Sequence, residues 1–372
     1  MSGPRVLEVS GRRDLERFIA FPYALHRGDA GWAPPLRRDV RAQLSPEHPF
    51  FRHAEAVHFL AERHGTVAGR ISAAWNRAHD AAHGDGAGFF GFFESVDDAA
   101  VAGALLDRAS EWLAARGRTT IRGPVSLSTN DEAGLLVEGF DTPATLLMPH
   151  NPRYYAPLVE GAGFTPAKDL LANQRVPTEL PERLVAAATR FASRRAITIR
   201  SLDRRRFDEE IDRVKVLYNR SWERNWGFVP MDDAEIGFLA AQLKPVVVPE
   251  LVAFAEVAGE TIGVAVALPD LNVALRRNPS GRFFPGVLRV ALAARRIDRL
   301  RVFMLGTLPE WRGKGVDALL YKAIWERARA RGYRWAEAGW VLEDNHPMRN
   351  ALVNMGFEQY KRYRIYDRPI AP

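Results

Sequence analysis

Apolar and polar positions follow one layout in two separate stretches of the chain. Phe59–Ala74 and Phe254–Leu268 each contain two apolar runs joined by a glycine turn, which predicts a β-hairpin. Two later stretches, 111–125 and 326–341, each predict a helix that stops at a glycine and leads into a strand. The pattern therefore predicts the same order of strands and helices twice.

A fixed spacing relates the two hairpins. Three residues of the first recur 194 residues later in the second: Glu62, Gly65 and Gly69 as Glu256, Gly259 and Gly263. Asn151 and Asn345 have the same offset. Such self-similarity indicates two copies of one architecture. We expect a first domain at 1–172, a linker helix at 173–195 that follows two prolines, and a second domain at 196–372.

Each predicted domain interleaves strands with helices, and the helix after residue 315 connects two strands that we expect to be parallel. This order is typical of the α/β class, with a central mixed β-sheet flanked by helices. The length of 372 residues and the hydrophobic content of 47% suffice for two domains with a core each.

The segment Arg312–Gly315 (RGKG) stands between an apolar run and the start of that helix. Unpaired N–H groups at a helix start favour a phosphate, and Gly313 and Gly315 let a ligand approach the backbone closely. Arg312 and Lys314 would add charge-assisted contacts. The segment therefore predicts a phosphate or pyrophosphate site, although a plain strand-to-helix turn would have a similar sequence.

Together with Asn345 and the pair Gly356-Phe357, this segment resembles the core of the GNAT-type acyltransferases. Asp317 departs from their motif, which has a small residue at this position. As a carboxylate in the first turn of the helix, Asp317 would complement the helix dipole. The resemblance implies two GNAT-like domains in tandem, acyl-CoA or acetyl-CoA as cosubstrate and an amine as acceptor. The cofactor-binding residues that it implies are Met304, Leu305, Gly306, Thr307, Arg312, Gly313, Lys314, Gly315, Val316 and Asn345.

The first half has no counterpart of this basic loop. Its equivalent segment carries three carboxylates, Glu94, Asp97 and Asp98, which would repel a pyrophosphate. We therefore expect one CoA per chain, bound by the second half.

Acid and base candidates follow two strands. In the first half, the segment STNDE gathers hydroxyl, amide and carboxylate groups at a strand end, where α/β folds commonly carry chemistry. Asp131 or Glu132 is a candidate base, and Asn130 or Ser128 would orient the substrate. A polar capping turn explains the same residues equally well. The second half adds two candidates, Glu343 and His346.

Aromatic residues are dense at 218–231, the region that forms the acceptor side in GNAT-like proteins. They would wall an apolar acceptor pocket, although a core helix with tryptophans four residues apart is the alternative. The candidate substrate-binding residues here are Trp222, Asn225, Trp226 and Phe228.

Residues 269–301 are an insertion between two strands that GNAT folds join tightly. The insertion is both basic and apolar, as in an interfacial helix on anionic lipid or a lid over an acyl chain. An amphipathic helix packed on its own domain is the alternative. With the tandem halves, the insertion is similar to a bacterial group of GNAT-like N-acyltransferases of long-chain amines that includes bacterial ceramide synthases. A lipid amine is thus one acceptor class, and a small-molecule amine is another.

The net charge of +7 suits a phosphate-bearing partner, although codon composition explains the arginine bias equally well. The arginines are dispersed, so we expect no nucleic acid as a partner. The absence of cysteine excludes disulfides and thiolate nucleophiles, and the scattered histidines predict no metal site. A polar N-terminus without an apolar signal predicts a cytoplasmic protein, with peripheral contact at the inner membrane face if the insertion meets lipid. A non-catalytic acyl-CoA sensor is the rival to an enzyme.

Overall fold

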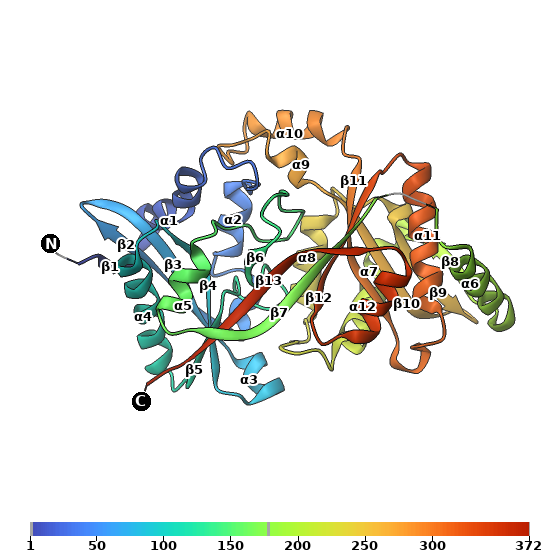
Figure 1. Cartoon of the computed structure of the whole chain (residues 1–372), viewed down its shortest axis with the longest axis horizontal. Helices are drawn as coiled ribbons and strands as arrows, with labels where there is room; N and C mark the ends of the chain where they lie inside the picture. The colour runs from blue at the N-terminus through green and yellow to red at the C-terminus, as the bar shows by residue number, and fades with distance from the viewer. Residues whose placement is uncertain (1–2, 177–178, 372) are drawn as a thin grey trace. The chain divides into compact units, whose positions relative to one another are not determined.

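The computed structural model of the chain describes residues 3–176 and 179–371 and divides them into two compact units (Figure 1). The first unit consists of residues up to Leu170, then Asn272–Arg295, and finally the C-terminal segment from Lys361. The second unit consists of Leu171–Leu271 and Arg296–Tyr360.

The first unit is a mixed β-sheet with helices packed on it. Its strands run in the order β1 (Arg5–Glu8), β2 (Ala54–Arg63), β3 (Thr66–Asn76), β4 (Ala87–Ser95), β5 (Thr120–Gly123) and β13 (Glu358–Pro369, in this unit from Lys361 on), and β6 (Leu135–Glu138) pairs with β13. Only β4 and β5 are parallel among the pairs with a recorded register in this unit. The helices are α1 (Gly11–Leu25), α2 (Arg37–Gln43), α3 (Arg77–His83), α4 (Ala99–Ala114), α5 (Tyr155–Gly161), α9 (Asn272–Leu275) and α10 (Gly286–Ala294), with a 3-10 turn at Pro49–Arg52.

The second unit repeats this arrangement. Its strand order is β7 (Thr165–Arg175, in this unit from Leu171 on), β12 (Trp335–Leu342), β11 (Arg299–Thr307), β10 (Glu260–Pro269), β9 (Val252–Val257) and β8 (Thr198–Ser201), and β11 and β12 are parallel. The helices are α6 (Glu182–Arg195), α7 (Phe207–Trp222), α8 (Asp233–Leu243), α11 (Val316–Ala330) and α12 (His346–Asn354), with 3-10 turns at Arg204–Arg206, Pro249–Leu251 and Pro309–Trp311. The predicted mixed α/β class and the parallel pair around the helix after residue 315 are confirmed.

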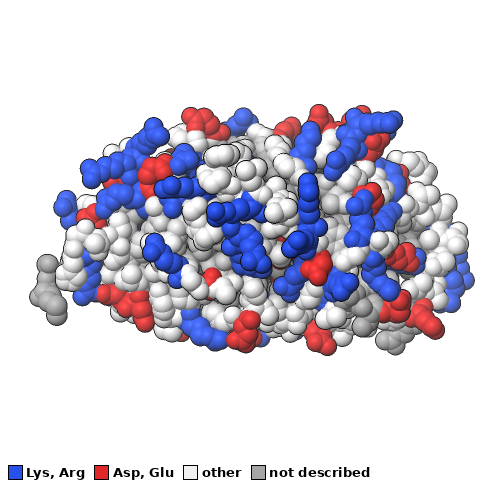
Figure 2. Space-filling model, turned by 90° about the horizontal axis from the view of Figure 1, so that it is seen from above, with Lys and Arg blue, Asp and Glu red and all other residues white. Residues whose placement is uncertain are grey.

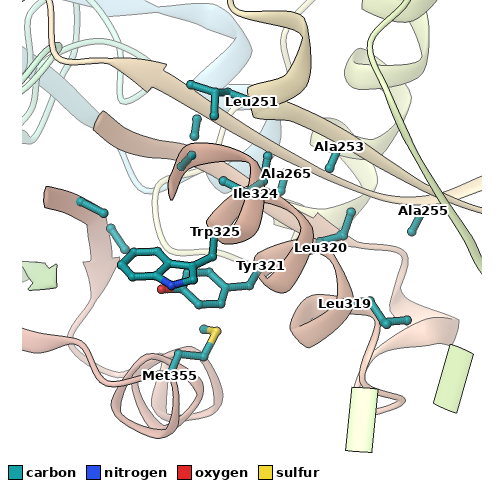
Figure 3. Close-up of a cluster of buried hydrophobic side chains, with 14 of the residues drawn as sticks. Leu251, Ala253, Ala255, Ala265, Leu319, Leu320, Tyr321, Ile324, Trp325 and Met355 are labelled. Atoms are coloured by element: carbon teal, nitrogen blue, oxygen red, sulfur yellow. The ribbon is translucent and has the colours of Figure 1, made fainter. Parts of the chain in front are cut away.

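Helix α11 forms the centre of the core in the second unit (Figure 3). Its inner face presents large side chains, among them Leu320, Ile324 and Trp325, to strands that carry alanines. Small residues on β9 and β10, such as Ala253 and Ala265, let the helix pack close to the sheet, since interiors are filled to the density of organic crystals. This packing fixes where α11 begins, and therefore where the preceding loop lies.

The repeat is visible in equivalent contacts of the two units. A Cβ at Gly69 of β3 would meet Val101 and Leu105 of α4, and a Cβ at Gly263 of β10 would meet Val316 and Leu320 of α11. In both units a glycine thus lets a helix cross the hairpin closely. The offset is 194 residues for the strands and 215 for the helices, since the insertion lies between them in the second copy.

Two segments of the predicted second domain, 196–372, are packed into the first unit. Asn272, at the start of α9, donates hydrogen bonds to the carbonyls of Ala144 (3.1 Å) and Thr145 (2.8 Å). At the C-terminus, β13 pairs with β5 from Tyr366 opposite Gly123 to Pro369 opposite Thr120. The compact units are therefore assembled from segments that are far apart in the sequence, and they differ from the stretches 1–172 and 196–372.

Candidate functional site

Strand β11 has one open edge at its C-terminal end. It pairs with β12 from Arg299 to Val302, and in the described residues that register ends opposite Ala338. On its other side it stays paired with β10 as far as Thr307. The register with β10 shifts at Phe303, and such a bulge locally bends and twists the strand that carries it. The predicted residues Met304, Leu305, Gly306 and Thr307 all follow this bulge, so an extended ligand could add to their edge as a strand does.

The loop after β11 has the geometry of an anion-binding helix start. A 3-10 turn at Pro309–Trp311 leads to Arg312, and α11 begins at Val316. Gly313 and Gly315 have φ of 67° and 74°, a region that glycine adopts without strain. Gly315 is the N-cap and has no side chain, so it offers no competing oxygen to the first N–H groups of the helix. A Cβ at Gly313 would meet nothing within 4 Å, so this side of the loop is open.

The two cations of the loop lie in different surroundings. Arg312 donates a 2.6 Å hydrogen bond from Nη2 to the carbonyl of Ser221 on α7, so its side chain ties the loop to that helix. Lys314 lies with Nζ 5.3 Å from the centre of the Trp311 ring. Asp317 is in the first turn of α11, as expected for a carboxylate that complements the helix dipole.

Trp222, at the end of α7, lies directly on Gly306. A Cβ at Gly306 would be 2.5 Å from Cη2 of this ring and 3.1 Å from Cβ of Ser221. The ring also packs against Tyr218, at 5.1 Å between centroids, and Tyr218 contacts Phe228 at 5.3 Å. Among the predicted substrate-binding residues, Phe228 is buried, whereas Asn225 and Trp226 are half-buried. Trp222 thus touches the strand segment that the resemblance to GNAT-type acyltransferases implies for the cofactor.

The candidates after β12 are at the start of α12. Asn345 is the N-cap, since its side-chain oxygen accepts a 3.2 Å hydrogen bond from the N–H of Met348. His346 is exposed, and the carbonyl of Glu343 accepts a 2.7 Å hydrogen bond from Arg349. The described contacts of Asn345 are therefore those of a helix cap.

In the first unit, Glu94 stands at the position that corresponds to Gly306, so a side chain is present where the second unit has none. A Cβ at Gly69 would lie 2.9 Å from the carbonyl oxygen of Glu94, just as one at Gly263 would lie 3.1 Å from that of Gly306. The Glu94 carboxylate is bonded to His26 (2.9 Å) and Tyr155 (2.6 Å) and lies 3.5 Å from Arg70. Burial alone would raise the pKa of Glu94, but His26 and Arg70 outweigh it and hold this pKa below its usual value.

Helix α4 of the first unit is capped by its own carboxylate. Asp98 accepts hydrogen bonds from the N–H groups of Ala100 (3.0 Å) and Val101 (3.3 Å), and its other oxygen pairs with Arg63. The N–H groups that would meet a phosphate are therefore engaged. Asp97 precedes this cap. These contacts give a physical reason to expect no CoA in the first unit.

The STNDE segment of the first unit folds as a local turn. Ser128 donates to the carboxylate of Asp131 (2.9 Å) and accepts from the N–H of Asn130 (3.1 Å). Gln43 donates to the other oxygen of Asp131 at 3.4 Å. Asn130 is half-buried and Glu132 is exposed. The turn that the sequence left as an alternative is thus present, and its carboxylates remain accessible at its surface.

Two polar arrangements escaped the sequence analysis. In the second unit, Glu337 is 0% and Arg301 4% exposed, 3.6 Å apart, and Tyr360 donates a hydrogen bond to the same carboxylate. In the first unit, Nε2 of His150 bonds Asp29 at 2.8 Å, and its buried Nδ1 has no hydrogen-bond partner among the described residues. Burial lowers the pKa of His150, against the effect of Asp29, so the ring is neutral near pH 7.

Comparison with known proteins identifies the family. Residues 211–357, which include β11, the loop and α12, match the model of the Acetyltransferase (GNAT) family. The bacterial ceramide synthase of Caulobacter vibrioides is 37% identical over 98% of this chain and 97% of its own length. The chain belongs to the GNAT family. This GNAT chain is also 34% identical to protein YghO of Escherichia coli over 96% of its length and 94% of that protein.

A solved structure shares the fold of the GNAT chain over its whole length. A tandem GNAT protein from the clavulanic acid biosynthesis pathway matches with a TM-score of 0.56 and 14% identity, and the match covers 99% of both chains. At that identity the likeness concerns the fold alone. The tandem GNAT organisation and the assignment as an acyltransferase, both predicted from the sequence, are confirmed.

The described residues contain neither a helix that could span a membrane nor a cluster that could hold a metal ion. None of the helices in 3–176 and 179–371 is long and apolar enough to cross a membrane. Within the same ranges, no three His, Asp or Glu side chains come together as a metal site.

Proposed function

We propose that this GNAT chain transfers an acyl group from acyl-CoA to the amine of a long-chain lipid. The observation that carries the cosubstrate is the basic loop Arg312–Gly315 at the start of α11, next to the open edge of β11. Backbone N–H groups, a helix dipole and two cations favour the pyrophosphate of CoA. The edge of Met304–Thr307 suits the extended pantetheine arm.

The lipid acceptor is supported by the relative that bears the name of bacterial ceramide synthase. A ceramide is the N-acylated form of a long-chain amine, and that relative matches this chain over nearly the full length of both. A match over nearly the whole length supports the same class of acceptor for this chain.

The thioester supplies an activated acyl group, so the residues need only position the reactants and move protons. A C–N bond forms at the carbonyl carbon and the C–S bond breaks, while the amine loses a proton and the sulfur gains one. We propose Asp131 or Glu132 as the base, with Asn130 and Ser128 orienting the amine. His150 is the alternative base, because a neutral imidazole held by Asp29 can accept a proton at Nδ1.

Calorimetric titration with CoA, acetyl-CoA and a series of longer acyl-CoAs tests the cosubstrate. We expect the affinity to rise with acyl length for a lipid-type enzyme, whereas equal tight binding of short forms would favour a small-amine acetyltransferase. The double variant Arg312→Ala with Gly315→Glu should lose binding, and Arg205→Ala, an exposed arginine on a 3-10 turn, is its matched control. Absence of binding by the wild-type chain would remove the cosubstrate from the proposal.

Mass spectrometry of the products tests the acceptor. The chain is incubated with one acyl-CoA and either a long-chain amino alcohol or a short primary amine. The proposal expects the amide of the long-chain amine. Product from the short amine alone would keep the acyltransferase and reject the lipid acceptor.

A further inference from the structure

Helix α10 and the residues before it expose a stripe of large apolar side chains. Phe284, Leu288 and Leu292 are 72%, 63% and 66% exposed. Leu288 and Leu292, four residues apart, lie on one side of α10, and Phe284 lies two residues before the helix begins at Gly286. Phe283, beside them, is 41% exposed. We call these four residues the α10 apolar surface. It holds four of the seven large hydrophobic side chains that the described residues expose, so the stripe is a concentration rather than chance scatter.

The exposure is imposed by the fold of the first unit, because the segment that leads to the stripe is anchored. Arg37 of α2 donates from its N–H to the carbonyl of Gly281 and from Nε to that of Ser280, both at 2.9 Å. Asn278 donates to the carbonyl of Arg282 at 2.8 Å. On the other side of α10, Gly286 and Val290 are buried. The helix therefore has a packed face and, opposite it, the α10 apolar surface.

The surroundings of this surface are basic. Residues 272–295 contain five arginines and no aspartate or glutamate. Four of these arginines, Arg277, Arg282, Arg289 and Arg295, are exposed. From α2, the guanidinium of Arg38 lies 3.7 Å from the centre of the Phe283 ring. Figure 2 views the chain from the side on which α10 lies in Figure 1, and basic side chains stand among uncharged surface there.

We propose that the α10 apolar surface docks on an anionic lipid bilayer. The phenylalanine and leucine side chains enter the boundary between headgroups and acyl chains, and the arginines meet lipid phosphates. A short helix with a one-sided apolar stripe, flanked by cations and free of acidic residues, complements such a surface in both polarity and charge. The proposal concerns where the chain binds and is independent of the proposed acceptor.

Co-sedimentation of the full chain with vesicles tests this docking. Vesicles of phosphatidylcholine with phosphatidylglycerol are compared with vesicles of phosphatidylcholine alone. We expect binding to the anionic vesicles that weakens at least tenfold in the triple variant Phe284→Ser, Leu288→Ser and Leu292→Ser. The control, Val216→Ser with Val353→Ser, removes two apolar side chains that are 51% and 68% exposed elsewhere, and it should bind as the wild type does.

A charge variant, Arg282→Gln with Arg289→Gln and Arg295→Gln, separates the two contributions. It should lose most of the preference for phosphatidylglycerol and most of the sensitivity to salt. Circular dichroism and an acyl-CoA titration check that each variant is folded. The proposal is overturned if the wild type stays in the supernatant, or if the triple serine variant binds anionic vesicles as well as the wild type does. It is equally overturned if light scattering finds a dimer that the serine variant abolishes while vesicle binding is unchanged.

Discussion

The ring of Trp222 covers the backbone of Gly306, and no side chain fits between them. We expect Gly306→Ala to destabilise the chain by about 1–3 kcal/mol, because the added methyl must displace a packed ring. It should also weaken acyl-CoA binding, since the edge of β11 shifts with it. Urea unfolding and calorimetry measure the two effects.

A second substitution makes this prediction specific. Trp222→Leu in the Gly306→Ala background shortens the opposing side chain and should restore part of the lost stability. Gly237→Ala on α8 is the matched control, since a Cβ there meets nothing within 4 Å. It should be neutral or stabilising by up to about 1 kcal/mol. An unchanged stability of Gly306→Ala would contradict the close packing.

Arg312 ties the loop to α7 through its hydrogen bond to the Ser221 carbonyl, and it also brings a positive charge to the proposed pyrophosphate site. Substitutions can separate these two roles. Arg312→Ala removes both the tether to α7 and the charge, and we expect the dissociation constant of acyl-CoA to rise about 10- to 100-fold. Arg312→Gln keeps a donor but loses the charge, so it should fall between Ala and wild type. Calorimetry at low and high salt measures these constants, and equal affinities for all three proteins would place the pyrophosphate elsewhere.

The buried pair of Arg301 and Glu337 should be costly to break on one side. Glu337→Ala removes the carboxylate that lies beside the buried Arg301 guanidinium, and we expect a loss of about 3–5 kcal/mol. Replacing both residues by methionine should cost far less, because no buried charge then remains. Urea unfolding of the single and double variants tests this difference. A double variant as unstable as the single one would argue against charge burial as the cause.

The base is tested by amide variants. Asp131→Asn or Glu132→Gln should lower kcat by about 10²- to 10⁴-fold and leave the affinity for acyl-CoA unchanged. Full turnover in both variants would move the role to His150, and His150→Gln would then be the variant that loses turnover. His53, whose Nδ1 lies 3.1 Å from Oδ1 of Asn76, provides the control His53→Gln.

His58 predicts how stability depends on pH. Burial lowers its pKa from 6.5 to about 4, so the unfolded chain binds the proton more tightly than the folded one. Stability is therefore full above about pH 6.5, falls as the pH drops toward 4, and is level below that. The loss is at most about 3 kcal/mol. Between pH 7 and 4, the free energy of unfolding should fall less in His58→Gln than in the wild type. In His64→Asn, at an exposed turn, it should change as in the wild type.

Local features of the site were predictable from the sequence, and long-range ones were not. The positive φ of Gly313 and Gly315 follows from RGKG between a strand and a helix, because only glycine suits such a turn. Trp222 remained either a core or a pocket residue, since its contact with Gly306 joins positions 84 residues apart. The partnership of Asp29 with His150 spans 121 residues, and no local pattern encodes it.

The boundaries of the units show the same limit. The internal repeat identified which strands of the two halves are equivalent, because equivalent strands are separated by the same number of residues. It contained nothing about where the insertion and the last strand would pack. The packing of the insertion depends on the Ala144 and Thr145 carbonyls, and that of the last strand depends on the edge of β5. Nothing in the sequence distinguishes these partners from the other residues of the polar and apolar stretches around them.

The pairing of β13 with β5 also orders events during synthesis. The first unit lacks a strand until Lys361–Pro369 has been made, and the ribosome must first translate the residues from 171 to 360. At about 5–20 residues per second this takes roughly 10–40 seconds, during which the edge of β5 is uncovered. A nascent chain would thus depend on holding factors for that interval. A product that stops before Lys361 would lack this strand, so the edge of β5 in its first unit would stay uncovered.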